Sequence, residues 1–145
     1  MGQQQLLLIV LGIIIVGIAI AVGVTTFRSS AVDANRAQVI SDLNNLAAKA
    51  QRFYRTPGSM GGGGQDFLAF SISALDTGNA NGSYSVTTTA PTGQAYVAGS
   101  TTAVAASAQT VYIVGCGTEK GDDATNQVKA FVTVTPDNVT AQKLN

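Results

Sequence analysis

The sequence predicts an α+β protein in which one long N-terminal helix packs on a small C-terminal antiparallel β-sheet. Three observations predict this fold. The chain opens with an unbroken apolar run, the following segment repeats apolar side chains at helical spacing, and the C-terminal part alternates β-branched, aromatic and polar residues between turn signals. The 145 residues leave room for one domain.

The first element is the apolar run Leu6–Val24, which is long enough as a helix to cross the hydrocarbon core of a bilayer. A secretory signal peptide has a shorter apolar region of ~7–15 residues behind a positively charged one. Here no Lys or Arg precedes the run, and it continues into a further helical pattern, so we expect it to be retained. We therefore expect residues 1–27 to form an apolar helix that lies first in a membrane and is then packed against copies of itself. The residues expected to form this surface are Leu6, Leu7, Leu8, Ile9, Val10, Leu11, Gly12, Ile13, Ile14, Ile15, Val16, Gly17, Ile18, Ala19 and Ile20.

Residues 28–145 are expected to form a head, which begins with an amphipathic half-helix over residues 28–55. Its apolar side chains recur at spacings of three, four and seven, so they share one face that should cover the sheet. The helix should end before Pro57, because the residue before a proline is pushed out of the α region. The apolar stripe consists of Val32, Val39, Leu43, Leu46, Ala50 and Phe53.

A glycine-rich loop over residues 56–82 and an antiparallel sheet over residues 83–145 complete the predicted head. The run Gly61–Gly64 favours flexibility or a close backbone approach over a packed element. Val, Ile, Tyr and Thr gather in the predicted strands, and residues 117–123 should connect the last two. The predicted strands are Tyr84–Thr88, Ala95–Ala98, Thr110–Gly115 and Val128–Thr135.

Composition excludes several chemistries. The chain has no histidine and one cysteine, Cys116, which excludes a Ser-His-Asp triad, C-x-x-C-H haem attachment and an intrachain disulfide. Eight basic residues balance eight acidic ones, so nothing indicates a nucleic-acid partner. Asp122 and Asp123, with Glu119 and Asp76, lack the spacing of a calcium loop. We therefore expect no enzyme activity, metal or cofactor, and a buried Cys116.

Two Asn-x-Ser/Thr sequons make Asn81 and Asn138 candidate glycosylation sites. Both lie in predicted loop or strand-edge positions, which is compatible with an exposed surface, and Asn81 belongs to the turn signal at residues 79–82.

The N-terminus resembles that of type IV pilins. Mature members of that family begin with Phe or Met, carry Glu at the fifth position and continue through about twenty apolar residues. Met1, Gln5 and the run from Leu6 follow this pattern, except that Gln replaces Glu. The resemblance implies that Met1 and Gln5 make polar contacts between subunits, and that a prepilin peptidase and a pilus assembly machinery act on the chain. A second alignment would place the mature end at Gln3.

These observations predict a structural subunit of an extracellular filament on the cell surface, which resides in the cytoplasmic membrane before assembly and whose partners are copies of itself. Two alternatives remain: a minor pilin or pseudopilin of a secretion or uptake machine, and a single-pass, membrane-anchored binding domain. Against the anchored domain, no Lys or Arg precedes the apolar run, and Arg28 lies on its head side.

Overall fold

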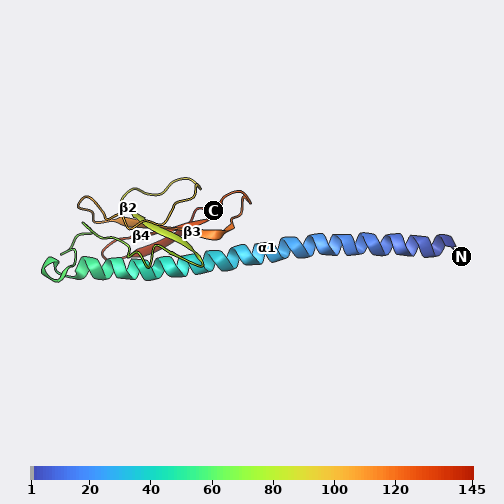
Figure 1. The fold of residues 1–145 in the computed structure, drawn as a ribbon, viewed down its shortest axis with the longest axis horizontal. Helices are drawn as coiled ribbons and strands as arrows, with labels where there is room; N and C mark the ends of the chain where they lie inside the picture. Colours follow the sequence, from blue (N-terminus) through green and yellow to red (C-terminus); the bar gives the residue numbers. More distant parts are fainter. Residues whose placement is uncertain (1) are drawn as a thin grey trace.

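The computed structural model describes residues 2–145 and confirms the predicted α+β fold class. Figure 1 shows a small head packed on the C-terminal half of one long helix, whose N-terminal half projects away from the head. The elements in chain order are α1 (Gly2–Arg55), a 3₁₀ turn (Gly58–Met60), β1 (Gly78–Asn79), β2 (Gly82–Thr87), β3 (Val111–Lys120), β4 (Gln127–Val134) and β5 (Val139–Lys143).

The helix α1 is continuous over 54 residues, which corresponds to about 80 Å at 1.5 Å per residue. It ends before Pro57, as predicted. The glycine loop that follows is an ordered cap. It makes the close backbone approach that the run Gly61–Gly64 predicts, because a Cβ added at Gly62 or Gly63 would overlap the backbone of Thr56 or Asp66. The backbone N–H of Gly63 donates to the carbonyl of Phe53 at 2.8 Å, and that of Gln65 donates to Tyr54 at 2.9 Å. These bonds satisfy carbonyls that the last helical turn would otherwise leave without partners.

All neighbouring strands are antiparallel, and their order in the sheet is β1-β2-β3-β4-β5. Three of the four predicted strands correspond to β2, β3 and β4. The connection predicted to begin at Gly117 is wrong, because β3 continues through a register irregularity to Lys120. The short β1 and the edge strand β5 are not among the predicted strands. Both are largely exposed, so their sequences carry only a weak pattern of apolar residues.

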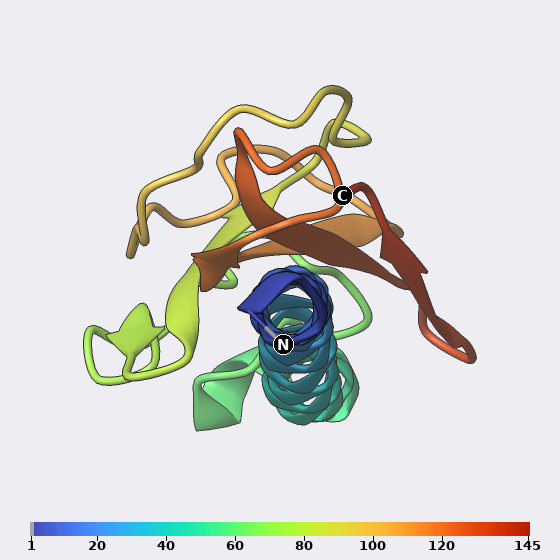
Figure 2. The same ribbon diagram turned by 90° about the vertical axis from the view of Figure 1, so that its right-hand side faces the viewer.

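The predicted strand Ala95–Ala98 is wrong. It lies in the segment 88–110, which has no regular structure. The first part of this segment runs over the face of the sheet that points away from α1 (Figures 1 and 2), and Val104 then packs into the core beside Phe70. The N–H of Val97 donates to Cys116 Sγ at 3.2 Å, and the hydroxyl of Ser83 donates to the carbonyl of Val97 at 2.9 Å. Side chains thus use the backbone groups that a strand partner would have taken.

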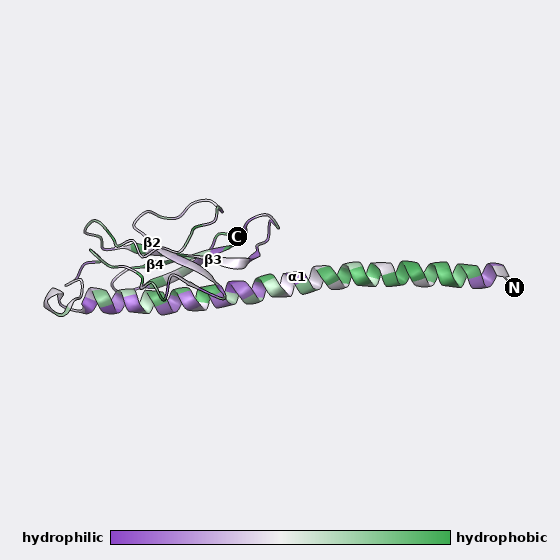
Figure 3. Ribbon diagram, in the orientation of Figure 1, coloured by the Kyte–Doolittle hydropathy of each residue, from purple (hydrophilic) through white to green (hydrophobic). Residues whose placement is uncertain are grey.

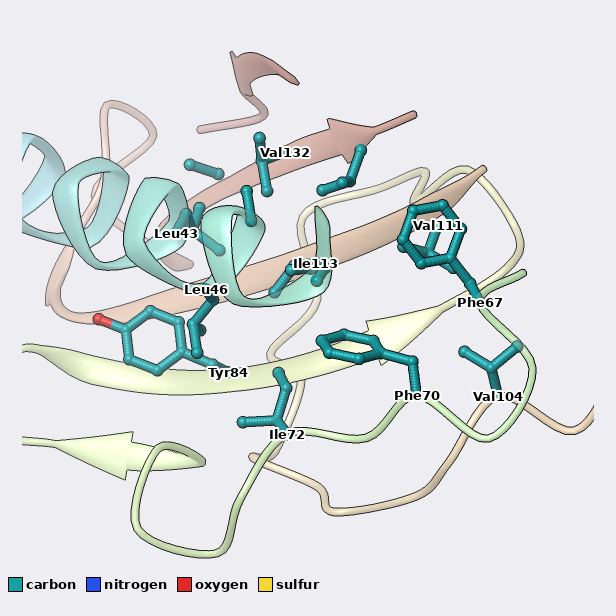
Figure 4. Close-up of a cluster of buried hydrophobic side chains, with 14 of the residues drawn as sticks. Leu43, Leu46, Phe67, Phe70, Ile72, Tyr84, Val104, Val111, Ile113 and Val132 are labelled. Atoms are coloured by element: carbon teal, nitrogen blue, oxygen red, sulfur yellow. The ribbon is translucent and has the colours of Figure 1, made fainter. Parts of the chain in front are cut away.

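The hydrophobic core lies between α1 and the sheet. Figure 4 shows Leu43 and Leu46 of the helix beside Ile113 and Val132 of the sheet, with the ring of Tyr84 closing one side. Five of the six stripe residues are buried, as predicted, and Phe53 is half-buried. The loop before the sheet contributes three more buried side chains, Phe67, Phe70 and Ile72.

Candidate functional site

The candidate site is the surface of the stalk, which we define as residues 2–27 of α1. Its large apolar side chains between residues 6 and 24 are exposed by 48% at Val10 and Leu11 to 70% at Leu7. Gly12, Gly17 and Ala19 are exposed as well. Figure 3 shows this half of the helix as almost uniformly hydrophobic, whereas the half under the head is mixed. The structure therefore places all the residues predicted for this surface on one uncovered helix.

The exposed surface extends all round the helix. Neighbouring residues on a helix point about 100° apart, and the consecutive side chains Leu6, Leu7, Leu8 and Ile9 are each more than 60% exposed. A helix that joins one partner needs only a stripe, whereas a helix that is apolar on every side needs cover on every side. Each such side chain gains about 1.5–3 kcal/mol when it is fully removed from water.

The stalk satisfies the length and composition expected of a membrane span. The apolar window of α1 has none of its residues buried within the protein. A bilayer accommodates such a segment because the helix satisfies its own backbone hydrogen bonds.

The glycines of the stalk have no packing role within the chain. A methyl group built on Gly12, Gly17 or Gly23 would meet nothing within 4 Å among the described residues. Glycine in a helix interior costs about 1 kcal/mol relative to alanine. Any compensation must therefore come from contacts outside the single chain, such as a close approach of neighbouring helices.

The structure describes one of the two residues predicted for polar contacts at the N-terminus. Gln5 lies on α1 and is exposed, with no side-chain hydrogen bond to any residue from 2 to 145. Met1 lies outside the described residues. A neutral amide at position 5 offers one acceptor oxygen and two donors to a neighbouring molecule.

A polar cluster around Asp42, which no sequence pattern indicates, fixes the β1–β2 hairpin to α1. Oδ2 of this carboxylate accepts hydrogen bonds from Tyr84 Oη at 2.7 Å, Asn79 Nδ2 at 2.9 Å and Asn81 Nδ2 at 3.2 Å. Burial alone would raise the pKa of Asp42, but hydrogen bonds from Tyr84, Asn79, Asn81 and Gln38 together hold it below its usual range. Burial raises the pKa of the Tyr84 hydroxyl, and the nearby Asp42 carboxylate, which accepts its hydrogen bond, raises it further. The donors come from the β1–β2 hairpin, which helical periodicity alone does not place.

The acidic residues near the end of β3 do not form a metal site with Asp76. Asp76 pairs with Lys49 at 2.6 Å, whereas Asp122 pairs with Arg36 at 2.6 Å and Lys143 at 2.9 Å. These two cations hold the pKa of Asp122 below its usual range. Residues 2–145 contain no group of three or more metal-ligating side chains.

Asp123 is a turn residue. Its pKa is lowered to about 2, first by the hydrogen bond from the Asn126 side chain and then by the backbone N–H groups of Thr125 and Asn126. Its carboxylate oxygens also accept from the side chain of the buried Asn145 at 3.2 Å. Hydrogen-bond donors within the protein thus occupy the Asp123 carboxylate and hold the β3–β4 loop in place.

Cys116 is buried, as expected, and burial raises the pKa of its thiol, which disfavours the reactive thiolate.

The two sequons differ in accessibility. Asn138 is exposed in the turn before β5, where its backbone and side chain close the turn with Thr135 and Val139. Asn81 is half-buried, and its side-chain amide is bound to Asp42. The turn predicted at Asn81 is present, but its side chain is part of the head structure.

The described fold defines the class of protein: a long apolar N-terminal helix packed on a C-terminal antiparallel sheet is a pilin-like architecture. No family model, no curated protein and no solved structure matches the chain. The fold and the exposed stalk are therefore the basis for any statement of function.

Proposed function

We propose that this protein is the structural subunit of an extracellular, type IV pilus-like filament that polymerises through the stalk. The observation that carries the proposal is the exposure of apolar side chains on every side of the helix between residues 6 and 24. A bundle of several copies covers every side of each helix, which a two-stranded pairing along one seam does not. The glycines without neighbours in the chain fit helices that approach closely in such a bundle.

The same surface supports a membrane stage before assembly. Lipid and a bundle of apolar helices offer the stalk similar surroundings, so transfer from one to the other does not require the helix to face water. The head packs along the other half of α1 and remains in water throughout. Growth by head-to-tail addition of identical subunits gives an open helical polymer.

Shearing the surface of native cells and imaging the released material by electron cryomicroscopy tests this proposal, with the polypeptide identified by mass spectrometry. We expect thin filaments with residues 6–24 at the core and the heads outside. Recovery of the chain only from membranes, without filaments, would contradict the proposal and favour an anchored binding domain. Recovery in trace amounts within filaments of another subunit would favour a minor pilin or pseudopilin.

A further inference from the structure

A groove with charged and apolar lining residues lies where the stalk meets the head. It has a volume of about 320 Å³ and lies between one face of α1 and the β3–β4 loop. The side chains and backbone that line it belong to Thr25, Arg28, Ser29, Val32, Asp33, Gly121, Asp122 and Ala124. Each of the helix residues among them has another three or four positions away, so neighbouring members adjoin along the helix surface.

The end of the groove nearest the stalk, where Arg28 lies, is at the level of a lipid headgroup when the stalk spans a bilayer. Arg28 is the first charged residue of the chain and follows Val24, the last residue of the apolar run, by four positions. Four helical residues span about 6 Å. The headgroup layer on each side of the hydrocarbon core has a thickness of about 5–8 Å, so Arg28 falls within it.

The charges of the groove leave one cation without a partner. Arg36 pairs with Asp33 at 2.7 Å and with Asp122 at 2.6 Å, and Lys143 pairs with Asp122 at 2.9 Å. These two cations and two anions cancel. Arg28 forms no ion pair and no side-chain hydrogen bond with any of residues 2–145, although its planar guanidinium suits bidentate binding of phosphate.

The groove also offers an acceptor for an ammonium group. Asp33 binds Arg36 through Oδ1 only, and its side chain is 66% exposed, so Oδ2 is available. Asp122, by contrast, uses both of its oxygens for Arg36 and Lys143. A cation and a carboxylate with a free oxygen in one groove match a headgroup that carries phosphate and a primary ammonium.

The helix face below the groove can accommodate an acyl chain. One and two turns toward the N-terminus from Thr25 are Ala21, which carries only a methyl group, and Gly17, which has no side chain, so this line of the helix has little bulk. Both residues are exposed in the single chain.

We propose that, before assembly, this groove binds a zwitterionic aminophospholipid such as phosphatidylethanolamine, with its phosphate on Arg28 and its ammonium on Asp33. This inference rests on the membrane stage of the proposed function. Binding at this position sets the depth and the rotation of the helix in the bilayer. Release of the lipid is then part of extraction into a filament.

The test uses the full-length protein in nanodiscs that contain equal amounts of phosphatidylethanolamine, phosphatidylcholine and phosphatidylglycerol. After mild detergent extraction, native mass spectrometry identifies the lipids that remain bound. We expect phosphatidylethanolamine to predominate, because the trimethylammonium of phosphatidylcholine cannot donate to Asp33. Arg28→Gln should lower the bound lipid about tenfold, the loss typical of one charge-assisted contact. Asp33→Asn should abolish the preference over phosphatidylcholine, whereas Asp33→Glu should keep it.

Arg52→Gln is the matched control, since Arg52 is an exposed arginine near the other end of α1. Equal loss of lipid from Arg28→Gln and Arg52→Gln would overturn the inference, as would retention of phosphatidylcholine or phosphatidylglycerol at least as well as phosphatidylethanolamine. Flotation of the protein together with the lipid measures its insertion into the membrane, independently of any lipid preference. A wild-type chain that inserts but shows no lipid preference refutes only the groove, whereas a chain that fails to insert refutes the membrane stage itself.

Discussion

Asp42 is the residue on which the attachment of the β1–β2 hairpin to α1 depends most. Three side-chain donors from that hairpin converge on one of its oxygens, and the buried Tyr84 is among them. The ring of Tyr84 also packs in the core, so its hydroxyl has little access to another acceptor. One carboxylate therefore joins polar and apolar parts of the same interface.

We expect Asp42→Ala to destabilise the head by about 1–3 kcal/mol, because it leaves a buried hydroxyl without an acceptor. Urea unfolding of the full-length protein in detergent measures this loss. In the double variant Asp42→Ala, Tyr84→Phe, the donor is removed together with its acceptor. The double variant should lose less stability than the sum of the two single losses, and strict additivity would show that the hydrogen bond does not couple these residues.

A second prediction concerns acid stability. The pKa of Asp123 is about 2 in the folded protein, whereas an unfolded aspartate titrates near 3.9. The unfolded chain therefore binds more protons below pH ~4, and the stability that Asp123 contributes is present above that pH. It is lost as the pH falls toward 2.

Urea midpoints measured from pH 7 to pH 2 should fall between pH 4 and pH 2 in the wild type. Asp123→Asn should show a shallower fall, because one of the responsible carboxylates is gone. Asp137→Asn is the control, as Asp137 is an exposed aspartate in the β4–β5 turn. Identical profiles for the wild type and Asp123→Asn would contradict this assignment.

At the scale of elements, Gly115 of β3 sets the distance between α1 and the sheet, because it has no side chain. A Cβ added at Gly115 would lie 2.8 Å from Val39 Cγ1 and 3.1 Å from the ring of Tyr84. Both contacts are too close for the existing packing. The helix and β3 can approach as they do because the strand has no side chain at this position.

Gly115→Ala should therefore destabilise the head by about 1–3 kcal/mol, the usual effect of overpacking a core. Thermal unfolding of the full-length protein in detergent measures it. Gly78→Ala is the matched control, since a Cβ there would meet only the carbonyl of Gly82 at 3.8 Å. A Gly115→Ala variant as stable as Gly78→Ala would mean that helix and sheet separate without cost.

The sequence predicts α1 well because its signals are local. The apolar run, the recurrence of Val39, Leu43 and Leu46, and the break before Pro57 can each be recognised within a few turns of chain. The same periodicity identified the residues that cover the sheet, and the stalk surface followed from composition alone.

The remaining features depend on partners distant in sequence. The predicted strand at Ala95–Ala98 fails because Cys116 and Ser83, from other strands, bind the backbone of Val97. The groove at the stalk–head junction is likewise invisible in the sequence, since Gly121 and Asp122 approach Arg28 only after the β3–β4 loop folds back. Patterns of polarity do not contain this information.

At the scale of the whole molecule, the proposed filament predicts that a single charge in the stalk prevents assembly. Ile14→Asp, or Leu7→Asp, would bury an unpaired carboxylate among apolar helices, at a cost of several kcal/mol. We expect no filaments in the sheared fraction from either variant, as seen by electron cryomicroscopy.

Ile14→Leu keeps the volume and polarity of the side chain and should assemble normally. Immunoblots of the membrane fraction verify that each variant is made and reaches the membrane. Normal filaments from Ile14→Asp would refute a core built from the stalk.

The continuity of α1 from Gly2 to Arg55 has a mechanical consequence for a filament of this kind. Tension applied along the fibre is transmitted by the overlapping helices. The sheet packs on the side of α1 and carries none of this load. The largely exposed first part of the segment, residues 88–96, lies on the side of the sheet opposite the helix, away from that load path (Figure 2), whereas Val104 further along the segment is buried in the core. Foreign peptides inserted within residues 88–96 would be displayed along the fibre without weakening it, which makes this part of the loop the place to engineer a surface.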